Sequence, residues 1–266
     1  MKYFLKAFFK ACCLLLIIFF IGACPLMYAR WRAPHVENSF EAAALLQNAM
    51  ETDGSSLQFR SEEINLDEVY KALEAQYPYA FSLHAITGSF NHVTELRIEL
   101  SRPARQKQAW QYAKALAQEC ITDTMGETEK LRALHDALIR LCQYDTDAAE
   151  ETSPDGTTAP FAADGALIDH KAVCSGYGRA YQMLCEAAGI HGMAYVSSEE
   201  MNHGWNAIRR NGVTYFIDCT FDDPVSDYGE YVLEQYFMLT SEQLSQTHTW
   251  NQDFYEEMFD YVGNIK

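Results

Sequence analysis

The sequence predicts an α+β fold, in which helices are followed by strands. Apolar residues recur at helical spacing in four segments before residue 150, and apolar and polar residues alternate on both sides of Asn211-Gly212. The four helical segments are 36–50, 61–76, 103–123 and 127–142. With 48% hydrophobic residues, the 266-residue chain can form one ordinary domain plus an appendage, and wholesale disorder is excluded. We expect a signal or anchor segment at 1–35, an N-terminal α/β appendage at 36–102 and a main domain at 103–266.

The first 35 residues differ from the rest of the chain, because they carry five basic residues and no acidic one. Residues 11–29 are uncharged and mostly apolar, long enough to span a bilayer, although Pro25 interrupts the helical pattern. Three interpretations stay open: a retained membrane anchor, a cleaved signal peptide, and a lipoprotein signal lipidated at Cys24. Each predicts a main domain outside the cytoplasmic membrane, either anchored to it or secreted.

The remainder of the chain is strongly acidic. Removing the five basic charges from the formal net charge of −17 leaves −22 for residues 36–266. We expect no nucleic-acid partner, since phosphates require the opposite sign. No phosphate-binding glycine loop or cluster with metal-ligand spacing occurs in the sequence, so no cofactor and no metal are expected. The oligomeric state does not follow from the sequence.

The appendage at 36–102 combines the first two helical segments with β-rich segments from Phe81 to Leu100 around Gly88-Ser89. It contains no constellation of reactive side chains. Two interpretations stay open, a cap or spacer packed on the main domain and a separate binding module.

A reactive cysteine is expected at the start of a helix. Cys174 stands just ahead of a helical pattern that ends near Gly189, and the pattern is set by Tyr177, Tyr181, Leu184 and Ala188. Unpaired NH groups and the positive end of the helix dipole favour thiolate over thiol at such a position. Cys174 is therefore a candidate nucleophile.

A β-hairpin is expected around the turn Asn211-Gly212, with His203 opening the first strand and Asp218 closing the second. Counting outward from the turn pairs Trp205 with Asp218, which makes His203 and Asp218 diagonal neighbours on one face. An imidazole and a carboxylate are thus brought together by strand pairing. With Cys174 they are the parts of nucleophilic acyl transfer.

Three stretches resemble the bacterial branch of the transglutaminase-like superfamily: VCSGYGRAYQMLCEAAGI, HGWN and YFIDCTFDDP, within roughly residues 127–239. The resemblance implies a papain-like core, with the nucleophile helix packed on an antiparallel sheet. It implies that Cys174 is the nucleophile, His203 the general base and acid, and Asp218 the residue that orients the imidazole. The substrate would be a peptide or protein amide, and residues 103–266 would be the catalytic domain of a cysteine peptidase or amidase.

Three other functions remain as alternatives. The first is transfer of the acyl group to an amine, which would make the protein a cross-linking protein-glutamine γ-glutamyltransferase. The second is a non-catalytic, surface-anchored binding protein, and the third is a different chemistry on the same three residues, such as deglycosylation of asparagine-linked glycans or amide cleavage in cell-wall peptides. The sequence departs from the family at Gly178 and Gly204, where alanine is usual, and these departures bear on the shape of the pocket. Tyr144, in a Tyr-Asp pair seen in bacterial relatives, either lines the cleft and holds the oxyanion or packs in the core.

Several other residues receive structural interpretations. Cys120 and Cys142 should lie too far apart for a disulfide, and Cys185 and Cys219 should be small buried residues. His135 is expected to be a partly exposed helical residue, and His170 is discounted as a rival base because it precedes the helix. We expect His248 and Trp250 to complete the core. Residues 146–165 are expected to form an acidic surface loop, with a lid over the cleft as the alternative.

Overall fold

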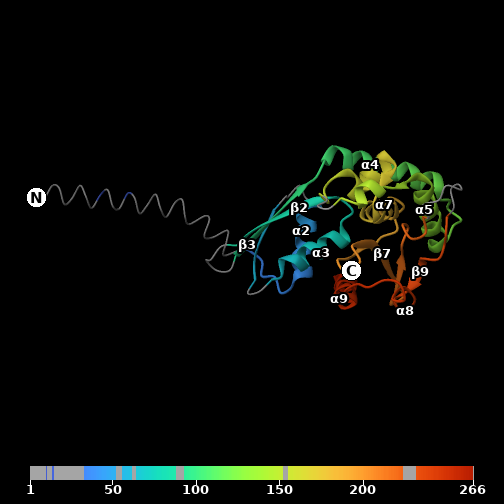
Figure 1. Ribbon diagram of the computed structural model, residues 1–266. Coiled ribbons are helices and arrows are strands. Elements are labelled where there is room, and N and C mark those ends of the chain that lie inside the picture. The colour runs from blue at the N-terminus through green and yellow to red at the C-terminus, as the bar shows by residue number, and fades with distance from the viewer. Residues whose placement is uncertain are drawn as a thin grey trace, which may run out of the picture. The chain divides into compact units, whose positions relative to one another are not determined.

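Figure 1 shows the computed structural model, which describes residues 10, 14, 33–51, 56–61, 64–87, 93–151, 155–223 and 232–265. Helices and strands are mixed, as expected. The described residues form two compact units, one of residues 33–69 with 84–97 and the other of residues 70–83 with 98–265. Apart from residues 10 and 14, the apolar segment before residue 33, including Cys24, lies outside the described residues. No helix in the described part of the chain is both long enough and apolar enough to cross a membrane.

The elements before residue 102 are helices α2 (Ser39–Glu51) and α3 (Leu66–Gln76) and strands β1 (Ser56–Arg60), β2 (Phe81–Thr87) and β3 (Val93–Leu100). Helix α3 begins five residues later than expected. Asn65 supplies the cap, because its Oδ1 accepts the backbone NH of Asp67 at 3.0 Å. Ser61 therefore does not open this helix.

Strand β1 was not expected from the sequence. It pairs antiparallel with β3, with Ser56 opposite Arg97, in a three-stranded sheet of order β1-β3-β2. Only one of its side chains, Phe59, is fully buried, so the strand is too short and too polar for its alternation to be recognised.

The larger unit contains helices packed with a two-stranded and a four-stranded sheet. Its helices are α4 (Pro103–Cys120), α5 (Glu127–Leu141) and α7 (Cys174–Ala187), followed near the C-terminus by α8 (Ser241–Leu244) and α9 (Gln252–Ile265). A parallel pair joins β4 (Gln143–Tyr144) to β5 (Lys171–Ala172). The main sheet is antiparallel in the order β6 (Met193–Ser198), β7 (His203–Arg210), β8 (Val213–Ile217) and β9 (Phe237–Thr240).

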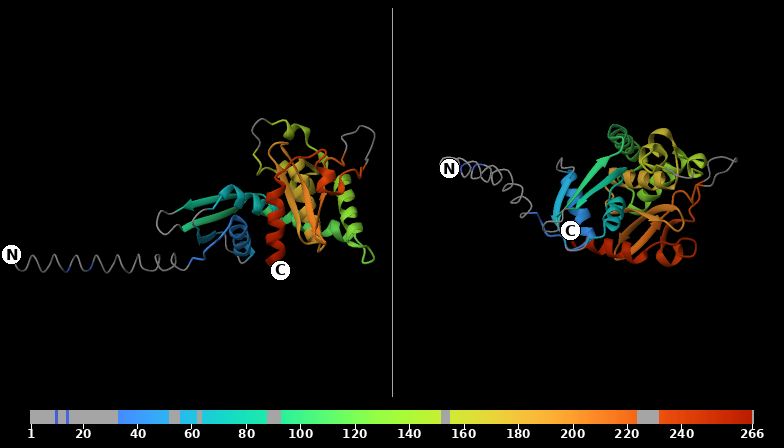
Figure 2. Two further views of the ribbon diagram at one scale, coloured as in Figure 1. Left: turned by 90° about the horizontal axis from the view of Figure 1, so that it is seen from below. Right: turned by 60° about the vertical axis from the view of Figure 1, so that its left-hand side comes forward.

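Helices cover both faces of this main sheet (Figures 1 and 2). Asn206 of β7 donates to the carbonyl of Gly178 in α7 at 2.9 Å. Arg209, whose side chain points to the opposite face because residues alternate along a strand, forms an ion pair with Glu256 of α9. Helix α7, which begins at Cys174, thus packs on an antiparallel sheet.

The segment 146–165 is not a plain surface loop. Helix α6 (Thr146–Ala149) begins it, a short 3-10 helix (Ala159–Phe161) follows, and residues 162–165 are buried. Asp164 is held by Arg102 (2.8 Å) and Arg105 (3.0 Å), and its side chain is fully buried. A buried carboxylate needs such partners, so this ion-pair cluster fixes the segment against the start of α4.

Candidate active site

Cys174 is the first residue of α7, and its side chain is partly exposed. The preceding residue, Val173, has an extended backbone and donates its NH to the carbonyl of Pro160 at 2.9 Å. No side chain caps the helix. Val173 therefore offers no side-chain acceptor to the first NH groups of α7, which can stabilise a negative charge at this end of the helix.

The hairpin has the expected register. Arg210 pairs with Val213, and the pairing continues to Asn206 opposite Ile217. Asn211 and Gly212 have φ angles of 54° and 78°, which is the left-handed geometry of a two-residue hairpin turn. Asp218 follows directly after β8, opposite Trp205 and two residues away in register from His203 at the start of β7.

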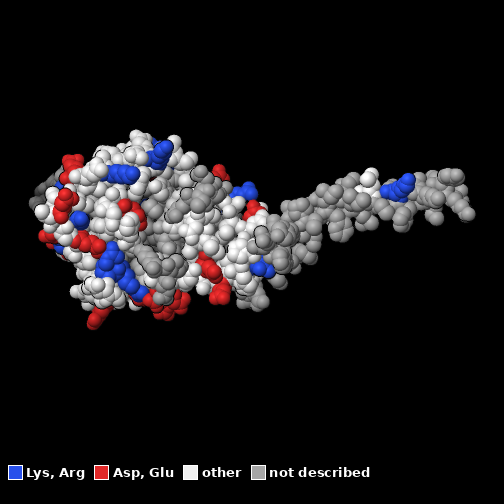
Figure 3. All heavy atoms as spheres, turned by 180° about the vertical axis from the view of Figure 1, so that it is seen from behind, with Lys and Arg blue, Asp and Glu red and all other residues white. Residues whose placement is uncertain are grey.

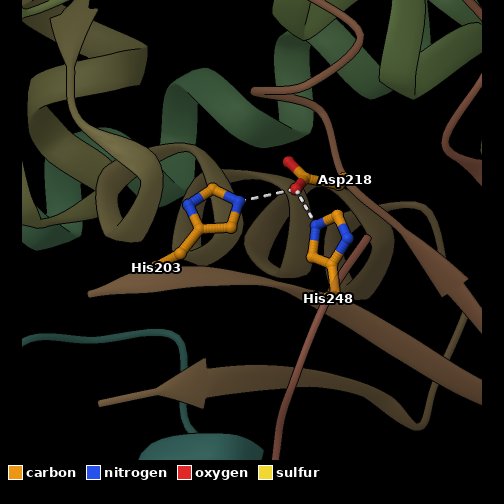
Figure 4. Close-up of side chains that lie close together, drawn as sticks. All are labelled: His203, Asp218 and His248. Carbon is orange, nitrogen blue, oxygen red and sulfur yellow. Dashed lines mark hydrogen bonds and ion pairs between the residues drawn. The ribbon is translucent and has the colours of Figure 1, made fainter. Parts of the chain in front are cut away.

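His203 and Asp218 are hydrogen-bonded, with His203 Nε2 donating to Asp218 Oδ2 at 2.6 Å (Figure 4). The carboxylate is 1% exposed. Its other oxygen, Oδ1, accepts from the NH of Thr220 at 2.9 Å, the hydroxyl of Thr220 at 2.5 Å and the NH of Phe221 at 3.1 Å. These donors stabilise the charged form, and the pKa of Asp218 is lowered because its hydrogen bonds outweigh the effect of burial.

A second histidine, not expected at the site, contacts the same carboxylate oxygen. His248 Nε2 donates to Asp218 Oδ2 at 3.1 Å (Figure 4). His248 is 1% exposed, so its burial agrees with the expectation of a core residue, but its ring has a polar partner. Sequence reasoning could not assign this partner, since His248 lies 30 residues beyond Asp218 and outside any periodic pattern.

Cys174 lies close enough to His203 to affect the pKa of its ring. Burial alone would lower the pKa of His203, but its hydrogen bonds with Asp218 and Cys174 outweigh burial and raise it to about 10. Because Nε2 of His203 is hydrogen-bonded to Asp218, Nδ1 is the ring nitrogen that can interact with the Cys174 thiol. The imidazole is thus stabilised as a cation beside Cys174.

Tyr144, the candidate oxyanion residue, also lies at the site. Burial raises the pKa of its hydroxyl, and the charges of Cys174 and Asp218 act in the same direction, whereas a hydrogen bond from the Cys174 backbone lowers it. Tyr144 is therefore close to Cys174, and its role with the oxyanion stays a prediction.

The two glycines that depart from the family lie against one side chain, Tyr195 of β6. A Cβ atom added to Gly178 would lie 2.7 Å from the Tyr195 ring, and one added to Gly204 would lie 2.0 Å from its hydroxyl oxygen. Tyr195 is 4% exposed and therefore occupies the space that two alanine methyl groups would need. The departures at Gly178 and Gly204 are thus compensated by one large residue.

Protonation of His203 should make the stability of the protein depend on pH. Its folded-state pKa lies near 10 and the ordinary value is 6.5, so the stabilisation is fully present below about pH 6.5 and is lost as the pH rises toward 10. We expect the thermal midpoint of the wild-type chain to fall more steeply between pH 7 and pH 10 than that of His203→Gln. Equal slopes in the two proteins, measured by circular dichroism, would contradict the raised pKa.

His203, Asp218 and His248 are also the kinds of residue that hold metals, and their ligating atoms lie within 4.8 Å of one another. The geometry, however, fits a hydrogen bond better than a metal site. Neighbouring ligands of a tetrahedral zinc ion are about 3.3 Å apart at bond lengths near 2.0 Å, whereas His203 Nε2 and Asp218 Oδ2 are 2.6 Å apart. A bound ion would also occupy the nitrogen that orients His203.

His170 and His135, which were also considered in the sequence, differ in their surroundings. His170 is exposed and its ring lies 6.1 Å from that of Tyr112. His135, expected to be partly exposed, is instead fully buried. Its Nδ1 lies 2.9 Å from Asp136 Oδ1 and its Nε2 lies 3.3 Å from Asp222 Oδ2, so acidic partners at i+1 and on a distant loop explain its burial.

The other described cysteines are free thiols, and three of these four are buried. Cys142, Cys185 and Cys219 are buried, and Cys120 is partly exposed. Burial raises the pKa of each of these four thiols, to about 12 for Cys142. They are consequently poor nucleophiles at neutral pH.

Residues 114–223 match the family model described as the transglutaminase-like superfamily. Kyphoscoliosis peptidase of Mus musculus is 23% identical over 125 residues, covering 42% of this chain and 18% of the relative. The Homo sapiens protein of the same name is 24% identical over 149 residues, covering 48% of this chain and 22% of the relative. The chain therefore spans about a fifth of the length of these curated relatives.

Two solved structures are also similar. One, a crystal structure of a TGase, has a TM-score of 0.38 and 15% identity, covering 56% of this chain and 46% of that one. The other, a proposed cysteine protease from Cytophaga hutchinsonii, has a TM-score of 0.32 and 12% identity, covering 63% and 69%. The family match includes Cys174, His203 and Asp218, and the chain therefore contains a transglutaminase-like domain.

Proposed function

We propose that this protein is an exported cysteine-dependent acyl-transfer enzyme that cleaves peptide or protein amides, with Cys174, His203 and Asp218 as its catalytic residues. The observation that carries the proposal is the His203–Asp218 pair, which is buried, hydrogen-bonded at 2.6 Å and in contact with the thiol at the start of α7. A non-catalytic binding protein would have no need of a histidine whose pKa is raised beside a cysteine.

The first half of the reaction follows from the positions of these groups. The Cys174 thiolate attacks the amide carbonyl, which forms a C–S bond and places the negative charge on oxygen near the Cys174 NH and the Tyr144 hydroxyl. His203, protonated on Nδ1, gives this proton to the amide nitrogen as the C–N bond breaks. An acyl-enzyme remains and the amine leaves.

In the second half, water attacks the thioester while neutral His203 accepts its proton through Nδ1. The C–S bond then breaks, and the carboxylic acid leaves. Asp218 keeps the imidazole in one orientation throughout, because Nε2 stays bound to its carboxylate. A primary amine in place of water would give an isopeptide bond by the same steps.

Hydrolysis is favoured over amine transfer, and the curated relatives support this choice because they are named as peptidases. The acidic net charge of −17 would attract cationic amines and supports the alternative of transfer. Among the described residues on the face shown in Figure 3, however, acidic side chains are spread among basic ones.

An apolar group of the substrate is expected to contact Phe221. This side chain is 40% exposed, and its ring lies 4.8 Å from the ring of His203. An exposed aromatic ring beside the general acid can bind an apolar side chain next to the scissile amide. Peptides with large apolar residues are therefore the first substrates to test.

The experiment that tests the function offers the full chain three probes: a peptide library, a glutamine peptide and a labelled primary amine. We expect cleavage of library peptides and little amine incorporation, with Cys174→Ala as the inactive control. Amine incorporation without cleavage would establish transfer instead. Fractionation of cells that express the full chain tests export, which requires the protein with the membrane or outside the cell and is contradicted by protein free in the cytosol.

A further inference from the structure

We infer that His248 is a positioning residue of the reaction, which holds the Asp218 carboxylate so that Oδ2 faces His203. The inference rests on the proposed function, because it concerns how the same thiol is activated. It adds a fourth residue to the three that the chemistry requires.

The two oxygens of Asp218 are held in different ways. Oδ1 accepts from groups of residues 220 and 221, which follow Asp218 directly in the chain. Oδ2 accepts from His203 at 2.6 Å and from His248 at 3.1 Å. Among the described residues, His248 is thus the one donor to Oδ2 that is not itself the general base. It can fix this oxygen whatever the protonation state of His203.

The tautomer of His248 suits this role. An ionised carboxylate can only accept hydrogen bonds, so Nε2 of His248 carries a proton. The other ring nitrogen, Nδ1, lies 2.8 Å from the hydroxyl oxygen of Thr247, which in turn lies 3.3 Å from the carbonyl oxygen of Leu244. Contacts at both ring nitrogens thus hold the ring with Nε2 directed at Asp218, as an outer hydrogen-bond partner orients a histidine in other sites.

Aromatic side chains fix the ring itself. Trp205 packs edge-on against His248 with ring centroids 4.8 Å apart, and Phe221 lies at 4.7 Å. Both also pack on His203, with centroid distances of 5.6 and 4.8 Å. The two imidazoles therefore share their aromatic neighbours as well as one carboxylate oxygen, and His248 has little freedom to turn away.

The test measures the rate at which iodoacetamide alkylates Cys174 in the full chain, as a function of pH, by mass spectrometry of the modified peptide. His248→Phe keeps a ring but removes the donor, and we expect it to slow alkylation at pH 6 about tenfold, a loss typical of a hydrogen bond to a charged group. We expect the profile to shift toward alkaline pH. His248→Gln retains an NH donor and should stay within about twofold of the wild type.

A double-mutant cycle separates positioning from packing. If His248 acts through Asp218, His248→Phe should have no further effect on alkylation in an Asp218→Ala background. An equal slowing in both backgrounds, or an unchanged pH profile in His248→Phe, would overturn the inference. Should His248→Phe fail to fold, Thr247→Val serves instead: it removes the partner of Nδ1 and should slow alkylation about threefold, and an unchanged rate overturns the inference.

The same measurement distinguishes this inference from the proposed function. If wild-type Cys174 reacts no faster than Cys120, the proposed function fails. If wild-type Cys174 is selectively reactive and both His248 variants match it, only the role of His248 fails.

Discussion

Replacing Cys174 with alanine should abolish amide cleavage and remove the fast alkylation by iodoacetamide at pH 6. Replacing His203 with alanine should slow alkylation of Cys174 by about 10²-fold or more, because the thiolate loses the cation that stabilises it. Both effects exceed those expected elsewhere in the molecule, since Cys174 forms the covalent bond and His203 moves the proton. Peptide mapping after brief labelling measures them directly.

Cys120→Ala is the matched control for this prediction. Cys120 is partly exposed, as Cys174 is, but it lies at the end of α4 and burial raises the pKa of its thiol. Its removal should leave activity and the labelling of Cys174 unchanged. Equal labelling of Cys174 and Cys120 in the wild-type chain would be incompatible with an activated nucleophile.

Replacing Gly204 with alanine should lower the thermal midpoint by about 6–12 °C, corresponding to roughly 3 kcal/mol for a domain of this size. The new methyl group would lie 2.0 Å from the Tyr195 hydroxyl oxygen and 2.6 Å from the ring carbon that bears it. The Tyr195 ring has little room to move away, because Gly178 lies against its Cδ2 and Cε2 atoms. His203, which directly precedes Gly204 in strand β7, should then be displaced, and alkylation of Cys174 should slow as well.

Two comparisons make this result interpretable. Gly263→Ala is a control in α9, where an added Cβ meets nothing within 4 Å, and it should change stability by less than about 0.5 kcal/mol. Tyr195→Val removes the clashing ring, so Gly204→Ala should cost less in that background than in the wild type. A Gly204→Ala protein as stable as Gly263→Ala would show that Tyr195 does not fill this space.

The parts of the site that the sequence could predict are those set by local pattern. The start of α7 at Cys174 follows from helical spacing, and the pairing of His203 with Asp218 follows from the tight turn at Asn211-Gly212. Strand register is fixed by a two-residue turn, and for that reason side chains 15 residues apart could be placed together from the sequence alone.

The parts that the sequence could not predict depend on contacts between distant segments. His248 reaches Asp218 only because β9 and α8 bring the chain back beside β8. His135 was expected to be partly exposed because no acidic partner stands four residues on, yet Asp222, 87 positions later, lies beside it. Strands β6 and β9 and helix α9 were missed as well, since their apolar residues lack clear alternation or lie in segments rich in tyrosine and acid.

The short hairpin that carries His203 and Asp218 also has a consequence for the order of folding. A hairpin of this kind closes within about 10 μs, using only contacts between neighbouring strands. Cys174 must approach from a separate helix, and docking of that helix requires closure of a longer loop. The imidazole and carboxylate are thus paired before the thiol arrives, and a nascent or partly folded chain carries an unactivated cysteine. Brief labelling of thiols at successive times during refolding would measure this order. Cys174 should become fast-reacting only after helix α7 has docked on the sheet.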